Sequence, residues 1–333
     1  MELEKINYIQ SENGSGKLCY YCANKEDADI IQFVEANRHV IEQQIHTHGG
    51  ILLRHFSLRS VSEFNQLANV FSPNLLDYIN RSTPRTRLGA KIYTATEYPP
   101  HKHILLHNEN SYTNTWPDKI LFFCIIVAQS GGETPVADGR CVLKKIDKKI
   151  IKKFNDKKIL YKRNYTAGID LSWQDVFQTS DTKEVIRYCD ENNIQYVWHD
   201  ASPKGLELTT QQICQATLKH PITAENVWFN QAHLFHISSL EAEDRNALLS
   251  VVSKDYLPRN TYYGDGSEIE VEDIKHIIDV YNSEKIIFQW EKGDVLILDN
   301  VLMPHARHPF AGERKIVVAM SSDKQANEFC KSS

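Results

Sequence analysis

Apolar residues recur at helical spacing near the start of the chain. Between positions 26 and 46 they stand at Ile30, Ile31, Val34, Val40, Ile41 and Ile45. This spacing is close to the 3.6-residue repeat of an α-helix, and Gly49-Gly50 is expected to end the helix. A second helix is predicted from Ser60, because Ser60 and Glu63 form a capping box ahead of the run EFNQLANVF.

Continuous apolar runs predict buried strands, because they are too short for a membrane span and are bounded by turn residues. They cover residues 51–56 (ILLRHF), 120–128 (ILFFCIIVA), 285–290 (KIIFQW), 295–299 (VLILD) and 315–320 (KIVVAM). Helical patterns at 239–253 and 271–281 precede the last three strands instead of separating them. Strands joined by short connections favour an antiparallel double-sheet jelly roll over a parallel βαβ arrangement.

We therefore expect a mainly β fold with flanking helices and a double-stranded β-helix (jelly roll, cupin-like) core. One domain is expected over residues 1–333, because no repeat, low-complexity tract or Pro/Gly/Ser-rich linker divides the chain. This domain would carry an N-terminal extension of helix and strand, and a helical insertion around residues 140–220.

The composition is that of an ordinary globular protein, with 41% hydrophobic and 24% charged residues. A net charge of -5 gives no general attraction to nucleic acid, so we expect no such partner. We also expect no membrane association and a cytoplasmic location, because the sequence has no run of 18 apolar residues and no signal-like start. The seven cysteines, an odd number, suggest reduced thiols.

The first candidate site is the motif LLHNENSY, in which one residue separates His107 from Glu109. Alternate side chains of a strand point to the same face, so this pair could present an imidazole and a carboxylate to one ion. The pair alone is weak evidence, but His305 follows a strongly apolar strand and supplies a third candidate ligand. Two histidines and one carboxylate leave three adjacent octahedral positions open, the arrangement of non-haem Fe(II) oxygenases. Two of these positions can chelate 2-oxoglutarate, and the last can receive O2.

The distal carboxylate of 2-oxoglutarate would need a cation inside a partly dry cavity, where an unpaired charge is costly. Arg314 begins the strand after His305, and its planar guanidinium can hold a carboxylate through two parallel hydrogen bonds. Such charge-assisted bonds contribute roughly 1.5–3 kcal/mol each. Thr134, in the turn GGET, could add a hydroxyl, although an ordinary turn residue would look the same.

With these pieces assembled, the chain resembles the TauD/TfdA family of 2-oxoglutarate-dependent dioxygenases, and within it the SyrP-like branch. The resemblance runs from about Gly49 to the end of the chain. Its motifs are LLHNENSY, FFCIIVAQSGGETPVADGR, VWFNQAHLFH, YYGDGSEI and WEKGDVLILDNVLMPHARHPFAGERK. The resemblance implies that iron is bound by His107, Glu109 and His305. It also implies that Thr134 and Arg314 contact 2-oxoglutarate.

The sequence departs from the commonest family pattern at two points. Glu109 stands where many members have aspartate, although glutamate is usual in the SyrP-like branch. The spacing from His305 to Arg314 is slightly short, so Arg307 is a second candidate for binding 2-oxoglutarate. Because halogenases of this superfamily lack the carboxylate ligand, the retained Glu109 favours hydroxylation, with desaturation as an alternative outcome.

The resemblance further implies a role in natural-product biosynthesis, on an amino acid or amino-acid-derived substrate that is free or held by a carrier domain of a peptide synthetase. Four polar residues in family-like motifs could orient this substrate or could equally satisfy buried backbone groups. They are Asn108, Asn230, Gln231 and His233.

The segment from Cys141 to Lys158 carries eight lysines, interleaved with apolar residues at helical spacing. It predicts an amphipathic helix with a basic face. Such a face is commonly just solvated, but it could also dock an acidic carrier protein by electrostatic steering. Charge reversal at four of these lysines would distinguish a docking face from a solvated one. They are Lys148, Lys149, Lys152 and Lys153.

Two competing functions fit the same scaffold. One is a non-catalytic jelly-roll binding protein, which would be expected to have lost part of the metal triad or the arginine. The other is a Zn-dependent hydrolase, because two histidines and one carboxylate also suit Zn²⁺. Arg314 and the GGET turn are better explained by a 2-oxo acid cosubstrate.

Overall fold

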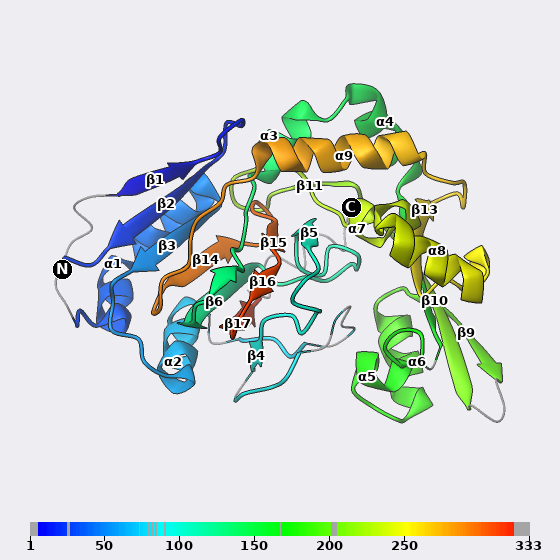
Figure 1. Cartoon of the computed structure of the whole chain (residues 1–333), viewed down its shortest axis with the longest axis horizontal. Helices are drawn as coiled ribbons and strands as arrows, with labels where there is room; N and C mark the ends of the chain where they lie inside the picture. Colours follow the sequence, from blue (N-terminus) through cyan, green and yellow to red (C-terminus); the bar gives the residue numbers. More distant parts are fainter. Residues whose placement is uncertain are drawn as a thin grey trace.

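A seven-stranded sheet occupies the left half of the computed structural model as Figure 1 shows it, with strand order β1-β2-β3-β14-β6-β17-β4. The structure describes residues 6–24, 27–72, 74–78, 80, 83, 85–89, 91–166, 168–200 and 205–322. The sheet's strands are β1 (Asn7–Gln10), β2 (Lys17–Cys22), β3 (Gly50–Arg54), β4 (Ile92–Thr94), β6 (Lys119–Ile126), β14 (Val295–Asp299) and β17 (Lys315–Ser321). Neighbours are antiparallel except β2 and β3, which are parallel.

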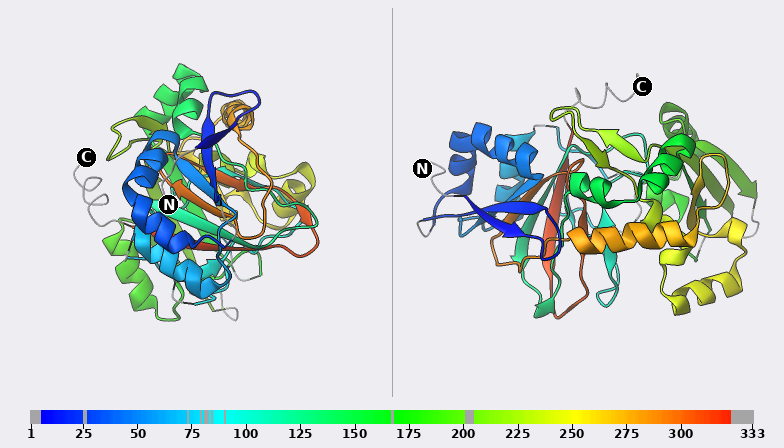
Figure 2. Two further views of the ribbon diagram at one scale, coloured as in Figure 1. Left: turned by 90° about the vertical axis from the view of Figure 1, so that its left-hand side faces the viewer. Right: turned by 90° about the horizontal axis from the view of Figure 1, so that it is seen from above.

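The central strands are apolar on both sides because both faces of the sheet are covered. On one face, Leu121 and Ile297 belong to a buried cluster with the apolar side of the helices α1 (Ile30–His48) and α2 (Val61–Phe71). These two helices lie together against the sheet (Figure 2). On the other face, Phe122 packs in a second buried cluster, which includes Trp290.

The two predicted N-terminal helices are confirmed, with bounds set by their caps. Asp29 begins α1 by accepting hydrogen bonds from the backbone N–H groups of Ile31 and Gln32. Gly49 ends it in the left-handed conformation, at φ 77°, where its N–H donates to Ile45. Ser60 caps α2 through the backbone N–H of Glu63, as the capping box predicts.

A four-stranded antiparallel sheet lies at the opposite end of the molecule from α1 and α2 (Figure 1), with strand order β13-β8-β10-β9. Its strands are β8 (Ile159–Tyr165), β9 (Gln195–Asp200), β10 (Leu206–Cys214) and β13 (Arg259–Tyr263). The helices α5 (Trp173–Phe177) and α6 (Thr182–Glu191) share a buried cluster with this sheet. The remaining elements of this half are β11 (Thr217–Lys219), β12 (Asn226–Trp228), α7 (Ala232–Phe235), η1 (Ile237–Ser239), α8 (Ala242–Val251), η2 (Lys254–Tyr256) and α9 (Val271–Glu284).

Besides the β11–β12 pair, two short antiparallel ladders stand apart from both sheets. In one, β5 (Ile104–His107) pairs with β15 (His305–Arg307), and the register places His107 opposite His305. In the other, β7 (Ser130–Gly131) pairs with β16 (Phe310–Ala311). The first ladder joins two chain segments that are almost two hundred positions apart.

Three local expectations are wrong. The run at 285–290 is not a strand, because its backbone makes only an isolated bridge between Ile286 and Val136 while its apolar side chains pack into the core. The basic segment forms two helices, α3 (Gly139–Lys145) and α4 (Lys148–Lys157), because Asp147 caps the second one. The region 140–220 is not a purely helical insertion, since it also contains β8, β9, β10 and β11.

The coarse fold class is confirmed as strands with flanking helices, while the single-domain organisation stays a prediction. Within the described residues, no helix combines the length and the apolar character that crossing a bilayer requires.

Candidate metal centre and the adjoining cavity

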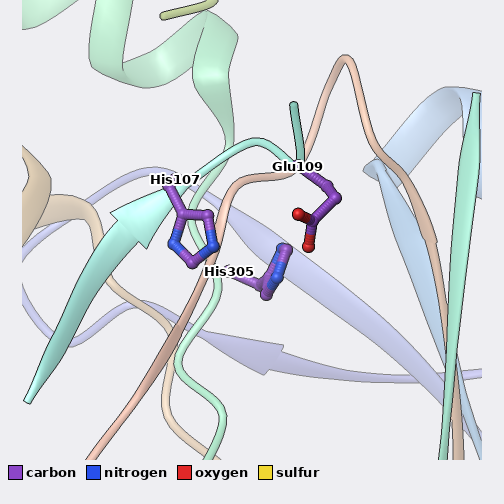
Figure 3. A group of neighbouring side chains, drawn as sticks. All are labelled: His107, Glu109 and His305. Carbon is purple, nitrogen blue, oxygen red and sulfur yellow. The ribbon is translucent and has the colours of Figure 1, made fainter. Parts of the chain in front are cut away.

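The three predicted ligands converge (Figure 3), with one potential ligand atom from each of His107, Glu109 and His305 lying within 4.8 Å of the other two. The two imidazole rings are 4.6 Å apart between centroids because their residues face each other in the β5–β15 ladder. Glu109 lies just beyond the end of β5, so it is not on the strand face that the HxE spacing suggested. The side chains of Glu109 and His305 are buried, at 2% and 5% exposure.

The hydrogen bonds fix which nitrogen of His107 faces this group. Its Nδ1 lies 2.8 Å from the carbonyl oxygen of Leu105, which can only accept, so Nδ1 carries the proton. The Nε2 lone pair is therefore left for an ion, as is usual for metal-binding histidines. Nδ1 of His305 is buried and has no hydrogen-bond partner among the described residues. The donor set thus suits a divalent cation.

Burial keeps both imidazoles neutral, which metal ligation requires. Desolvation lowers the pKa of His107 below its ordinary value. It places the pKa of His305 well below that value, and the neighbouring His107 adds to the shift. Both rings are therefore ready to bind a cation at neutral pH.

Two residues that the sequence did not single out hold Glu109 in place. The guanidinium Nη2 of Arg85 donates to Glu109 Oε2 at 2.6 Å, in an ion pair whose side chains are 3% and 2% exposed. Asn300 clamps the backbone of Glu109: its Oδ1 accepts from the Glu109 N–H at 2.7 Å, and its Nδ2 donates to the Glu109 carbonyl at 3.0 Å. No sequence motif indicated either contact, because Arg85 lies in an irregular segment and Asn300 is 191 positions from its partner.

A cavity extends from the histidines to a second polar region. Its lining residues are Arg85, Ala95, Thr96, Ile104, His107, Phe122, Thr134, His305, Ala306, Arg307 and Arg314. Three arginines therefore face one small space, which indicates a site for anionic groups.

Arg314 is the arginine whose charge is least compensated. Its Nε donates to the carbonyl of Gly132 at 2.9 Å and its Nη2 donates to Thr134 Oγ1 at 3.3 Å. Among the described residues, no carboxylate lies within ion-pair distance of it. Burial, with the charge of Arg307 in addition, lowers the pKa of Arg314 to about 10, so the side chain is still a cation at neutral pH. A buried cation without a carboxylate partner favours the binding of an anionic ligand.

The GGET turn allows the side chain of Arg314 to lie close to the backbone of Gly132. Gly132 has a φ of 77°, and a Cβ at that position would lie 2.9 Å from Arg314 Cδ. The next residues bring Thr134 to the cavity, where its hydroxyl also accepts from Trp290 Nε1 at 3.0 Å. The turn thus places the hydroxyl and the guanidinium side by side.

Arg307 is already committed to the backbone. Its guanidinium donates to the carbonyls of Tyr98, Pro99 and Lys102 at distances of 2.8, 2.6 and 2.9 Å. These bonds anchor the loop ahead of β5. Of the two arginines that the sequence proposed for 2-oxoglutarate, the geometry therefore favours Arg314.

The four candidate substrate residues all bond backbone groups. Asn108 Nδ2 donates to the Asn300 carbonyl, and Gln231 Nε2 donates in turn to the carbonyl of Asn108. Asn230 Nδ2 donates to Ala216, and His233 Nε2 lies 2.8 Å from the carbonyl of Leu106. His233 lines a separate cavity. None of the four lines the cavity that contains His107 and Arg314, so the structure favours their role in satisfying the backbone.

The comparisons with known proteins are consistent with one another. The family model described as Taurine catabolism dioxygenase TauD, TfdA family, matches residues 18–320. The dapdiamide synthesis protein DdaC of Enterobacter agglomerans is 41% identical over 308 residues, which cover 92% of each chain. The clavaminate synthase-like protein At3g21360 of Arabidopsis thaliana is 24% identical over 298 residues, covering 87% of this chain and 86% of its own.

Solved structures share the fold. The PvcB protein from Pseudomonas aeruginosa superimposes with a TM-score of 0.55 at 12% identity, covering 97% of this chain and 92% of its own. A second structure of PvcB describes that protein as an Fe, alpha-ketoglutarate dependent oxygenase from an isonitrile synthetic pathway. At this identity the likeness concerns the fold alone.

Proposed function

Because this chain belongs to the TauD, TfdA family, we propose that it hydroxylates an amino acid or an amino-acid-derived compound in natural-product biosynthesis. It is an Fe(II)- and 2-oxoglutarate-dependent oxygenase, with O2 as the second cosubstrate. The residues that hold these groups and the identity of the organic substrate are the parts that we propose.

His107, Glu109 and His305 are the proposed iron ligands. Their support is the buried donor set itself: two neutral imidazoles and one carboxylate with ligand atoms within 4.8 Å of each other, opening onto a cavity with cationic walls. The two-histidine, one-carboxylate set is the one used by non-haem Fe(II) oxygenases. When bound, the iron supplies the site at which O2 is activated.

Arg314 and Thr134 are the proposed contacts of the 2-oxoglutarate distal carboxylate. Arg314 can form a charge-assisted pair with this carboxylate, while Thr134 can donate its hydroxyl hydrogen. This pairing would compensate a buried charge that has no carboxylate within ion-pair distance among the described residues. Arg307 remains the second candidate, disfavoured because three backbone carbonyls accept its hydrogen bonds.

The double-stranded β-helix is the proposed arrangement of the core. The large sheet would form its major face, and the short ladders β5–β15 and β7–β16 would belong to its minor face. This arrangement would have the candidate ligands between the two faces. Jelly-roll folds of this kind commonly enclose their sites in the same way.

A carrier-bound substrate is also part of the proposal, and its support comes from the lysines of α4. Lys153 pairs with Glu270 and Asp273, so it does not present its charge freely to a partner. Lys148 and Lys149 are exposed and form no ion pair with another described residue. Of the four lysines at which charge reversal was proposed, these two are therefore the best placed to contact a carrier.

Charge reversal tests this docking. The variant Lys148→Glu/Lys149→Glu should slow turnover of a carrier-bound substrate while leaving turnover of the free amino acid unchanged. Lys183→Glu on α6, another exposed lysine, is the matched control. Equal rates on the carrier-bound substrate for both variants would contradict docking at α4.

Anaerobic reconstitution tests the site as a whole. Wild-type protein with Fe(II) and 2-oxoglutarate should develop the visible charge-transfer absorption of a 2-oxo acid chelated to iron. His107→Ala should abolish the band, while His103→Ala should keep it because His103 lies outside the group of three candidate ligands. A wild-type protein that binds iron without developing the band would refute the cosubstrate assignment, and Zn-dependent hydrolysis would then be the better hypothesis.

A further inference from the structure

Arg85 contacts the carboxylate of Glu109, one of the candidate iron ligands, through a single charge-assisted hydrogen bond. Its guanidinium Nη2 lies 2.6 Å from Glu109 Oε2. The same guanidinium stacks over the ring of Tyr78, 4.3 Å from the ring centroid, and the residue lines the cavity with His107 and Arg314. Arg85 therefore acts on the carboxylate from inside the site.

Glu109 is consequently held at both ends. Asn300 accepts from its backbone N–H and donates to its carbonyl, which fixes where the side chain begins. Arg85 fixes one of the two oxygens at the other end. The free movement of the side chain is therefore small, and Oε1 is the oxygen without this charge-assisted bond.

The number of oxygens that Glu109 offers matters for the chemistry. A carboxylate can bind a cation through one oxygen or through both. Glutamate has one more rotatable bond than aspartate, so it reaches a two-oxygen geometry more easily. If both oxygens bound, Glu109 would occupy one of the three positions that the cosubstrate and O2 need.

We propose that Arg85 is a positioning residue that makes Glu109 a one-oxygen ligand and thereby keeps three adjacent coordination positions open. Its bond to Oε2 is charge-assisted and buried, so it competes effectively with a second oxygen–metal contact. This inference rests on the proposed metal site. It assigns Arg85 no contact with the organic substrate.

Water coordination on Mn(II), bound in place of iron without cosubstrate, provides the test. The relaxation of water protons by bound Mn(II) grows with the number of exchangeable waters on the ion. Wild-type protein should give a relaxivity that corresponds to three waters. Arg85→Met removes the donor, so both oxygens of Glu109 can bind, one water is lost, and relaxivity per bound ion should fall by about a third.

Two further variants make the result specific. Arg85→Lys keeps a cationic donor and should restore much of the wild-type relaxivity. Arg314→Gln removes another buried cation from the same cavity but does not touch Glu109, so it should leave the relaxivity unchanged. If Arg85→Met does not fold, Arg85→Gln replaces it, because the shorter amide cannot reach Glu109.

The outcomes separate this inference from the proposed function. Equal relaxivity in wild type and in Arg85→Met would overturn the role of Arg85, as would a wild-type value that corresponds to two waters. In either case, bound Mn(II) and an intact charge-transfer band would leave the iron site standing. If Mn(II) does not bind to wild-type protein, the proposed metal site fails, and the positioning role fails with it.

Discussion

The two ends of the cavity are prepared for their ligands in opposite ways. At the metal end, Glu109 is already paired with Arg85, and His107 is oriented by a backbone carbonyl. At the far end, Arg314 donates hydrogen bonds to the neutral groups of Gly132 and Thr134 and lies over the neutral ring of Phe310. Charge is compensated within the protein at the first end and left for a ligand at the second.

This difference explains how the affinities for the metal and for the anionic ligand arise. The metal end depends on geometry, because its ligands are held where a cation needs them before the cation arrives. The far end depends on an unpaired charge, because an incoming carboxylate removes the cost of a buried cation. Substitutions at the two ends should therefore change different measured quantities.

Loss of a metal ligand should have the largest effect. His305→Ala removes one of three candidate donors, so Fe(II) affinity should fall by more than the roughly 10- to 100-fold lost when only a supporting partner is removed. Titration of Fe(II) or Co(II) under anaerobic conditions measures this affinity. Unchanged Fe(II) affinity in a folded His305→Ala protein would mean that the ion binds elsewhere. The end of the cavity that contains His305 would then not be the metal end.

Removing the cation at the far end should come next. Arg314→Gln should weaken 2-oxoglutarate binding by roughly 10- to 100-fold, from the loss of about 1.5–3 kcal/mol for a charge-assisted bond. Affinity for the metal alone should stay as in wild type. Calorimetric titration of the Mn(II)-loaded protein with 2-oxoglutarate measures the first quantity.

Arg307→Gln is the matched comparison. It should lower the melting temperature, because the loop at 96–102 loses its anchor, and change 2-oxoglutarate affinity much less. A larger loss of 2-oxoglutarate affinity in Arg307→Gln than in Arg314→Gln would reverse the assignment of the two arginines.

The backbone clamp on Glu109 should give a smaller effect. Asn300→Ala removes the bonds to the N–H and the carbonyl of Glu109, so metal affinity should fall roughly tenfold. Asn230→Ala is the control, because Asn230 is equally buried and its side chain also bonds backbone groups, none of which belongs to a candidate metal ligand. Equal loss of metal affinity in both variants would show a general effect of stability and not a clamp.

The sequence predicted the parts of this site that depend on local pattern. The caps Asp29 and Ser60 lie at or near the predicted helix starts, and the order of motifs along the chain selected His107, Glu109 and His305. Hydrophobic periodicity follows from neighbouring residues, so it can be recognised without knowing the fold.

The remaining parts depend on contacts between distant segments. Arg85 meets Glu109 across 24 positions, and Asn300 meets it across 191. The run at 285–290 has the composition of a strand, but among the residues that the structure describes only Val136 pairs with it, at Ile286. The single helix predicted for the basic segment is divided into two, because the side chain of Asp147 caps the backbone N–H of Lys149 and begins a new helix there. Such outcomes are decided by tertiary structure, which a single sequence pattern does not contain.

The last contrast between the two ends is their response to acid. Burial lowers the pKa values of His107 and His305 in the folded protein, whereas in the unfolded chain histidine titrates near 6.5. Below about pH 6.5 the unfolded chain therefore binds protons that the folded chain does not. The free energy of unfolding of the metal-free protein should consequently fall as the pH is lowered. Arg314 and Thr134 do not titrate in this range.

Denaturant unfolding of metal-free protein at pH 7.5 and 5.5 measures this contrast. The free energy of unfolding of wild type should fall between the two pH values. In His305→Asn this fall should be smaller by up to about 1.4 kcal/mol, because one titrating imidazole is missing. Arg314→Gln should lose as much stability as wild type. His233 and His236, whose pKa values burial lowers to about 4, add the same pH dependence to all three proteins, so only the differences between proteins count. If His305→Asn and wild type lost stability equally, His305 would be protonated in the folded protein as readily as in the unfolded chain, and the metal end would not hold a neutral imidazole ready for the ion.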